Sequence, residues 1–174
     1  MKAQVVEQVT VAQAKTAIAQ TAALYFAKDA NILSCTPRGR SSGIGKTEVV
    51  RQVAEEQGLA FLSYSVTHHT RQSAIGLPRL SECEVDGRTV PITEYTMSEI
   101  IAEVYRVMRE SGKKEGILFL DEFNCASETL RPIMLQLLQS KTFGPHAIPD
   151  GWMLVLAGNP SEYKGIRTPP SYAA

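Results

Sequence analysis

The sequence of 174 residues predicts a three-layer α/β domain built on a mostly parallel sheet. A glycine-rich loop separates an apolar run at 31–35 from a helical pattern over 48–57, and a second apolar run follows at 59–65. This strand–helix–strand succession is a crossover unit, which joins parallel strands. Two later apolar runs, 117–120 and 152–158, are typical of strands that are buried on both faces.

Length and composition indicate one domain over residues 1–174, with 161–174 as an irregular tail. Lys+Arg and Asp+Glu both number 18, so the neutral chain offers no support for binding to nucleic acid or a membrane. The N-terminus lacks the apolar segment of a signal peptide, and no apolar run approaches membrane-spanning length. The three cysteines form no Cys-x-x-Cys pair, which favours reduced thiols in a cytoplasmic protein.

The N-terminal helix is predicted by a capping box, in which Thr10 and Gln13 can bond each other's backbone. Apolar residues then recur at spacings of three and four. The helix over 48–57 should end at Gly58, in the position after a helix that glycine favours. Residues 66–78 are expected to form a loop.

A β-hairpin is predicted where Asp86-Gly87, a strong two-residue turn signal, separates two short strands at 82–85 and 88–91. The hairpin should project from the α/β core as a small insert.

Two further helices are expected. Thr96 to Glu99 has the pattern of a second capping box, and the helix that it opens should end near Ser111. The next helix should cover 127–139, with a start blurred by Pro132 because proline suits only a first turn. Residues 143–146 are expected to be loop.

The glycine-rich loop over 38–47 has the composition and context of a phosphate-binding loop. Small residues let the backbone N–H groups surround an anion, and the following helix adds its positive end. Lys46 can reach the β- and γ-phosphates of a nucleotide, and the Thr47 hydroxyl can bind Mg²⁺. The residues expected to hold the nucleotide are Ser41, Ser42, Gly43, Ile44, Gly45, Lys46, Thr47 and Glu48.

One position departs from the strict loop pattern. Arg40 stands where the first glycine should be, while Gly39 comes one residue too early. Either Arg40 occupies that corner or the loop is one residue longer. The alternative is a glycine-rich turn that binds nothing.

Polar side chains follow two of the predicted buried strands. Asp121 and Glu122 follow the predicted strand at 117–120, and Asn159 follows the predicted strand at 152–158. Ligands bind at the carboxyl ends of parallel strands, which is where these side chains should lie. Asp121 suits Mg²⁺ held through water, and Glu122 suits the base that polarises an attacking water. Asn159 can bond the γ-phosphate or that water, so Glu122, Asn159 and Lys46 are the candidate catalytic residues. The alternatives are an ordinary acidic strand end and a turn asparagine before proline.

Adjacent histidines at 68 and 69 raise the question of a metal site. Neighbouring positions lack the spacing of a helical ligand pair, and no cysteine or carboxylate stands at ligand spacing. Surface polar residues are the favoured interpretation.

Nearly the whole chain, roughly from Thr10 to Tyr163, resembles the AAA+ ATPases, and among them the MoxR-like and dynein-related (AAA_5-type) group. The similar motifs are the Walker A residues 43–47, the Walker B residues 117–122 and the sensor 1 residues 158–160. The predicted hairpin resembles an insert that this group carries in its second helix.

The resemblance implies a sheet order of 5-1-4-3-2, ATP and Mg²⁺ as cofactors, and a homo-oligomeric ring that remodels proteins, often beside a von Willebrand factor A domain partner. It places the arginine finger, the fifth strand and the helical lid after sensor 1, and none of these can be located here. We therefore expect MgATP binding with slow hydrolysis. The alternative is a nucleotide-binding assembly or regulatory module with little activity. A small P-loop kinase fits less well, because Asp121, Glu122 and Asn159 suit water activation.

Overall fold

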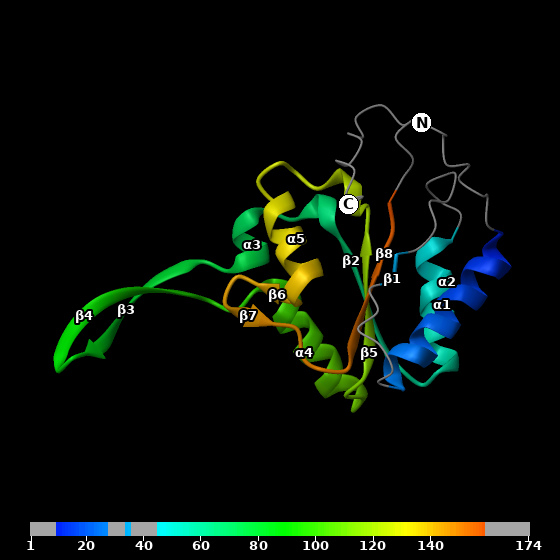
Figure 1. Cartoon of the computed structure of the whole chain (residues 1–174), viewed down its shortest axis with the longest axis horizontal. Helices are drawn as coiled ribbons and strands as arrows, with labels where there is room; N and C mark the ends of the chain where they lie inside the picture. Colours follow the sequence, from blue (N-terminus) through cyan, green and yellow to red (C-terminus); the bar gives the residue numbers. More distant parts are fainter. Residues whose placement is uncertain (1–9, 28–33, 36–44, 159–174) are drawn as a thin grey trace.

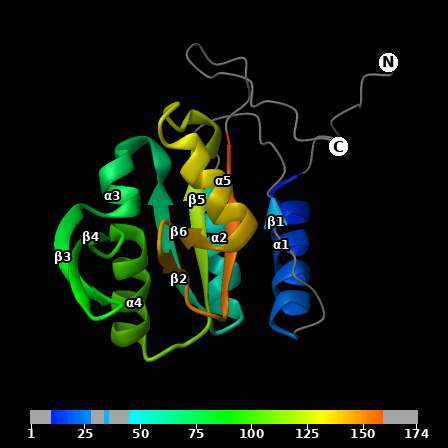
Figure 2. The same ribbon diagram turned by 60° about the vertical axis from the view of Figure 1, so that its left-hand side comes forward.

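The computed structural model describes residues 10–27, 34–35 and 45–158. A parallel sheet stands at the centre, with helices on both of its faces (Figures 1 and 2). Its strands, in spatial order, are β1 (Ser34–Cys35), β8 (Trp152–Leu156), β5 (Gly116–Asp121) and β2 (Ala60–Ser65). In chain order this is first, fourth, third and second, so the predicted α/β class and the predicted order of these four strands are confirmed.

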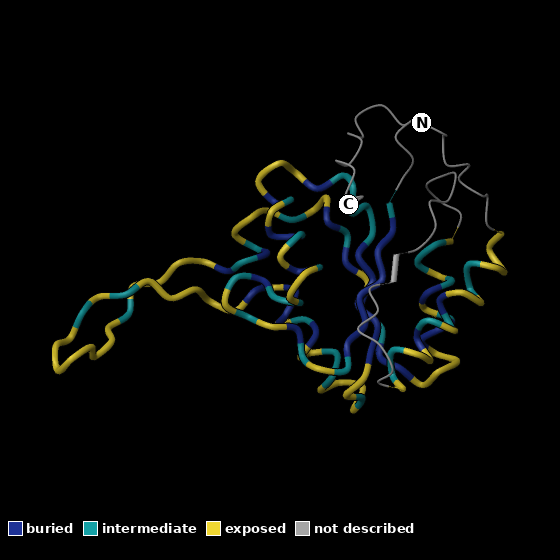
Figure 3. Tube along the Cα trace, in the orientation of Figure 1, coloured by how far each residue is buried: buried dark blue, intermediate teal, exposed yellow. Residues whose placement is uncertain are grey.

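Alternate side chains of β5 enter two separate cores. Ile117 and Phe119 pack with the helices α1 and α2, whereas Leu118 and Leu120 pack with α4 and α5 on the opposite face. All four are fully buried, and the buried trace follows the central strands (Figure 3). Coverage of both faces explains why this strand is a continuous apolar run.

The first helix begins, and the second helix begins and ends, close to where the sequence predicts. In α1 (Val11–Phe26) the capping box is present: Thr10 N–H donates to Gln13 Oε1 at 2.8 Å, and Gln13 N–H donates to Thr10 Oγ1 at 3.2 Å. The second helix, α2 (Lys46–Glu56), starts two residues earlier than the apolar pattern, and Gly58 follows it with φ +70°.

The prediction of a loop over 66–78 is wrong. A single 3₁₀ turn, η1 (Val66–His68), is followed by the short helix α3 (Arg71–Ile75). Thr70 caps α3, since its Oγ1 accepts the Ser73 N–H at 3.3 Å. A helix of one turn is too short to show an apolar period, and its capping residues are its only sequence signal.

The predicted hairpin is confirmed and is longer than expected, with β3 (Pro78–Val85) paired to β4 (Arg88–Tyr95). Asp86 and Gly87 have φ of 51° and 71°, the positive values of a type I′ turn. The two strands form a ribbon that extends away from the α/β core (Figure 1).

The second predicted capping box is wrong, although the helix it announced is present as α4 (Glu99–Ser111). Ser98 is the N-cap residue of α4. Thr96 instead joins the base of the hairpin: its Oγ1 accepts the Leu77 N–H at 2.9 Å, and its own N–H donates to the Leu77 carbonyl at 2.9 Å.

The last helix, α5 (Arg131–Ser140), starts four residues later than predicted. Pro132 lies in its first turn, where the missing N–H costs no hydrogen bond. The loop expected at 143–146 contains a second small hairpin, β6 (Thr142–Phe143) with β7 (His146–Ala147). Phe143 is fully buried and fixes this hairpin against the core.

Candidate functional site

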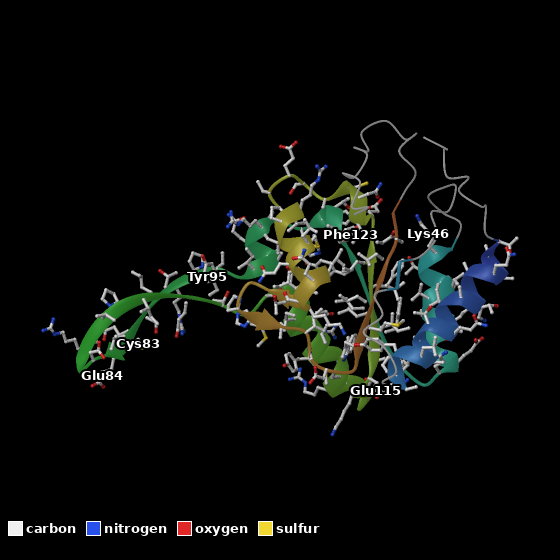
Figure 4. The ribbon with its side chains drawn as sticks, viewed as in Figure 1. Lys46, Cys83, Glu84, Tyr95, Glu115 and Phe123 are labelled. Atoms are coloured by element: carbon white, nitrogen blue, oxygen red, sulfur yellow. The ribbon has the colours of Figure 1, made fainter. Side chains whose placement is uncertain are left out.

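Three strands end, and one helix begins, at the same edge of the sheet. In the register of the parallel strands, Ser65 of β2 lies beside Asp121 of β5, and Leu120 lies beside Leu156 of β8. The N-terminus of α2, marked by Lys46, opens at this edge, and Phe123 lies across from it (Figure 4). The carboxyl ends of the strands therefore form the floor of the candidate site.

Lys46 is the first residue of α2, and its side chain is half-buried. Gly45 precedes it with φ +77°, a left-handed conformation that favours glycine. The Lys46 ammonium donates a hydrogen bond to the Gly158 carbonyl at 3.4 Å. This contact brings the lysine to the end of β8, one residue before Asn159.

The N-terminus of α2 has the features that attract an anion. The first N–H groups of a helix have no acceptor within the helix, and the helix dipole adds positive charge. Thr47 and Glu48 supply two of these groups. The Glu48 side chain is exposed and accepts hydrogen bonds from Arg51 at 2.7 Å and Gln52 at 3.0 Å, which lower its pKa. Its backbone N–H, rather than its carboxylate, is the group suited to a phosphate.

Asp121 and Glu122 lie at the end of β5, and both are half-buried. Asp121 Oδ1 accepts the Glu122 N–H at 2.8 Å. Glu122 itself has φ 54°, a left-handed conformation that is uncommon for a residue with a side chain. The Phe123 N–H then donates to the Ala157 carbonyl at 2.9 Å, which joins the turn after β5 to the end of β8.

Two hydroxyl groups hold the Glu122 carboxylate. Its Oε2 accepts hydrogen bonds from Thr67 Oγ1 at 2.7 Å and from Ser65 Oγ at 3.1 Å. Sequence reasoning missed both residues. Ser65 could have been found from its place at the end of β2, next to the strand that carries Glu122, whereas Thr67 depends on the unpredicted turn η1.

Asn124 and Cys125 complete the turn after β5. A Cβ atom on Gly158 would lie 2.9 Å from Asn124 Oδ1, so the close approach of this side chain favours glycine at 158. Burial raises the pKa of the Cys125 thiol, and the negative charges of Glu122 and Asp121 raise it further.

The adjacent histidines take no part in this site. His69 stacks on Tyr64 with ring centroids 3.7 Å apart, and its Nδ1 lies 3.6 Å from Glu99 Oε2. Only 16% of the His69 side chain is exposed, so its interpretation as a surface residue is wrong, whereas His68 is exposed. Among the residues described, no group of three or more His, Cys, Asp or Glu could hold a metal ion.

The structure thus brings Lys46, Thr47, Asp121 and Glu122 to one edge of the sheet. Ser41, Ser42, Gly43, Ile44 and Asn159 lie outside the described residues, as does Arg40. In the described part of the chain, no helix is both long and apolar enough to cross a membrane.

Comparison with known proteins identifies one matching family. The model of the ATPase family associated with various cellular activities (AAA) matches residues 41–141, more than half of the chain. A search of curated proteins finds no match.

Proposed function

This chain belongs to the ATPase family associated with various cellular activities, and on that premise we propose that it binds and hydrolyses MgATP at the site described above. An AAA domain implies ATP binding.

One observation carries the proposal: the lysine at the start of α2 meets the strand end of β8, and the carboxylates of β5 share that edge. The phosphates of ATP would bind at the N-terminus of α2, against the N–H groups of residues 45–48 and the loop residues Ser41 to Ile44. Lys46 would add a cation to the β- and γ-phosphates, a role that suits a compact point charge on a flexible stem.

Thr47 and Asp121 fit a magnesium site, because hydroxyl and carboxylate oxygens are ligands that Mg²⁺ accepts together with phosphates and water. With Oδ1 accepting the Glu122 N–H, the Asp121 carboxylate is oriented by the backbone. The ion would neutralise charge that develops on the phosphates.

Glu122 is the proposed base for the attacking water, and Asn159 would bond that water or the γ-phosphate. The hydroxyls of Ser65 and Thr67 both donate to one oxygen of Glu122, so they determine the direction of its carboxylate. Orientation of the base contributes to the rate, because proton transfer requires hydrogen-bond distance and alignment.

We extend the proposal to a MoxR-like role, in which a homo-oligomeric ring remodels protein partners, including one with a von Willebrand factor A domain. The support is the β3–β4 hairpin, which stands between α3 and α4 where the insert of that group was expected. Proteins of the AAA family often assemble into oligomers, which agrees with a ring.

The test of nucleotide binding is Lys46→Ala, measured by titration with a fluorescent ATP analogue. Loss of the cation should weaken binding by more than about tenfold, which is about 1.4 kcal/mol. Lys113→Ala is the matched control, because the Lys113 ammonium also donates to a backbone carbonyl, that of Leu59 at 3.0 Å. Equal affinity in Lys46→Ala and the parent would remove the phosphate loop from the proposal.

A second function, nucleotide binding without useful catalysis, is separated from the first by turnover. A chain that binds the analogue and shows no more phosphate release than its Glu122→Gln variant would be a binding module.

A further inference from the structure

The β3–β4 ribbon carries apolar side chains that nothing in the described structure covers. Leu80 is 81% exposed, Val85 49% and Tyr95 43%, and Leu77, directly before β3, is 58% exposed. Within the described residues, β3 and β4 pair only with each other. Figure 4 places Glu84 near the tip of the ribbon and Tyr95 near its base. A two-stranded ribbon with exposed apolar groups on both faces is typical of a surface that receives a partner.

The two faces of the ribbon differ in charge, because successive residues of a strand point to opposite faces. One face, here called the acidic face, carries Leu80, Glu82 and Glu84 from β3. Opposite them in the register, the same face carries Thr93, Pro91 and Thr89 from β4. Both arginines of the hairpin, at 79 and 88, fall on the other face. The acidic face therefore has no basic side chain among residues 78–95, all of which are described.

The backbone of the same β3 residues points away from β4. Thr96 N–H donates to the Leu77 carbonyl at 2.9 Å, so the pair 77–96 is a hydrogen-bonded pair. Hydrogen-bonded pairs alternate with non-bonded pairs along antiparallel strands. The pairs that contain Leu80, Glu82 and Glu84 are then non-bonded, and the N–H and C=O groups of these residues point outward.

The prolines agree with this alternation and distinguish the two edges. Pro78 and Pro91, which have no N–H, both fall in the outward-pointing set. Pro91 interrupts the outer edge of β4 in its middle. The outer edge of β3 keeps three successive outward donors at Leu80, Glu82 and Glu84, and we call this the β3 edge.

We propose that the β3 edge binds an extended segment of a partner protein, which adds to the ribbon as a third strand. The backbone of Leu80, Glu82 and Glu84 supplies the ladder of hydrogen bonds, and their side chains select the partner. Basic residues at alternate positions of the segment lie beside Glu82 and Glu84, and an apolar residue lies beside Leu80. The recognised chemistry is a strand that is basic and apolar on one face.

A second copy of this chain fits the β3 edge poorly. Pairing of two β3 edges around a two-fold axis at Glu82, Cys83 or Glu84, the centre of the acidic stretch, places one of these carboxylates opposite another, and like charges directly opposite are destabilising. Acidic residues on a free edge also deter aggregation, but that role does not account for Leu80, the most exposed large apolar side chain described.

The probe is a fluorescent peptide with Lys, Lys and Ile at alternate positions separated by Thr, and binding is followed by anisotropy at low salt. A peptide of the same composition, with the two lysines adjacent, is the control, because its charges fall on opposite faces. We expect the alternating peptide to bind at least about fivefold more tightly, as two exposed cross-strand charge pairs allow. Equal affinity of the two peptides would overturn the proposal.

Charge reversal locates the site. Glu82→Lys with Glu84→Lys should abolish this preference and transfer it to a peptide in which Glu replaces Lys. Glu115→Lys with Asp150→Lys is the matched control, since both residues are exposed and the change in net charge is the same. Failure of the reversed peptide to bind the reversed ribbon, with the ribbon still folded by circular dichroism, would contradict a site at these two residues.

Proline substitutions test which edge is used. Leu80→Pro removes an outward donor from β3, and Thr93→Pro removes the outward donor directly opposite on β4. Leu80→Ala separates the loss of the side chain from the loss of the donor. We expect Leu80→Pro to weaken peptide binding beyond Leu80→Ala, while Thr93→Pro leaves it unchanged. Binding that is lost in Thr93→Pro and kept in Leu80→Pro would place the segment on β4 and overturn the proposal. Sedimentation that shows a dimer without peptide, which Leu80→Pro dissociates and Thr93→Pro does not, would assign the β3 edge to a second copy.

Discussion

Glu122 shows how single residues carry the chemistry of this site. Its left-handed backbone turns the chain sharply at the end of β5, and two hydroxyls hold its carboxylate. Glu122→Gln keeps the shape and loses the base, so we expect unchanged ATP binding and a fall in turnover of about 10²-fold or more. Phosphate release measured beside Glu115→Gln, an exposed control, checks this. Turnover at the parent rate would show that Glu122 is not the base.

Thr67 offers a second prediction at the scale of a residue. Thr67→Val removes the 2.7 Å hydrogen bond to Glu122 with little change in volume. Because the carboxylate is then less well oriented, kcat should fall several-fold while the affinity for ATP stays the same. In a background of Glu122→Gln the same substitution should have no further effect, since residues that act through each other are not additive. Additive losses would mean that Thr67 acts independently of Glu122.

The connection between α3 and the hairpin depends on Gly76. Its φ is +102°, and a Cβ atom there would lie 1.9 Å from the Thr96 carbonyl oxygen. Gly58, with φ +70° and nothing within 4 Å, provides a control for the backbone conformation alone. We expect Gly58→Ala to lower the free energy of unfolding by about 1–2 kcal/mol and Gly76→Ala to lower it distinctly more. Urea denaturation of the two variants measures the difference, and equal losses would show that Thr96 moves aside freely.

At the scale of the whole molecule, His69 joins the layers. Its ring stacks on Tyr64 of β2, and Glu99 of α4 lies beside it. Burial lowers the pKa of His69 below its ordinary value, and the nearby His68 lowers it slightly further. The negative charge of Glu99 acts in the opposite direction but does not outweigh burial. The unfolded chain therefore takes up a proton at higher pH than the folded chain, and stability falls as the pH falls from about 6.5 toward the folded pKa.

His69→Phe keeps the stacked ring and removes the titration. Urea denaturation at about pH 7.5 and about pH 5.5 should show a larger loss of stability in the parent than in this variant. Equal losses would indicate that the pKa of His69 is the same in the folded and unfolded chains.

Elements with a strong local pattern were predicted well, and those defined by a few contacts were not. The Asp86-Gly87 turn, the apolar run of β5 and the capping box at Thr10 each appear as expected, because one short segment contains all the atoms that decide them. The capping box expected at Thr96 does not form, because the Thr96 hydroxyl instead accepts a hydrogen bond from the backbone of Leu77, nineteen residues earlier in the chain.

The sequence by itself determined the α/β class, the four-strand order that the family resemblance implies and the membership of Lys46, Asp121 and Glu122 in one candidate site. Apolar runs, turn residues and motif spacing can each be read from a short stretch of sequence. Because ligands bind at the carboxyl ends of parallel strands, these patterns also predict where the site lies in the fold. Only the tertiary structure decided that Ser65 and Thr67 hold Glu122, and that the β3 edge faces outward with its acidic residues. The contacts of Glu122 depend on which strands lie side by side, and the orientation of the β3 edge depends on the register of the hairpin. A shift of the register by one residue would turn every side chain of a strand to the opposite face.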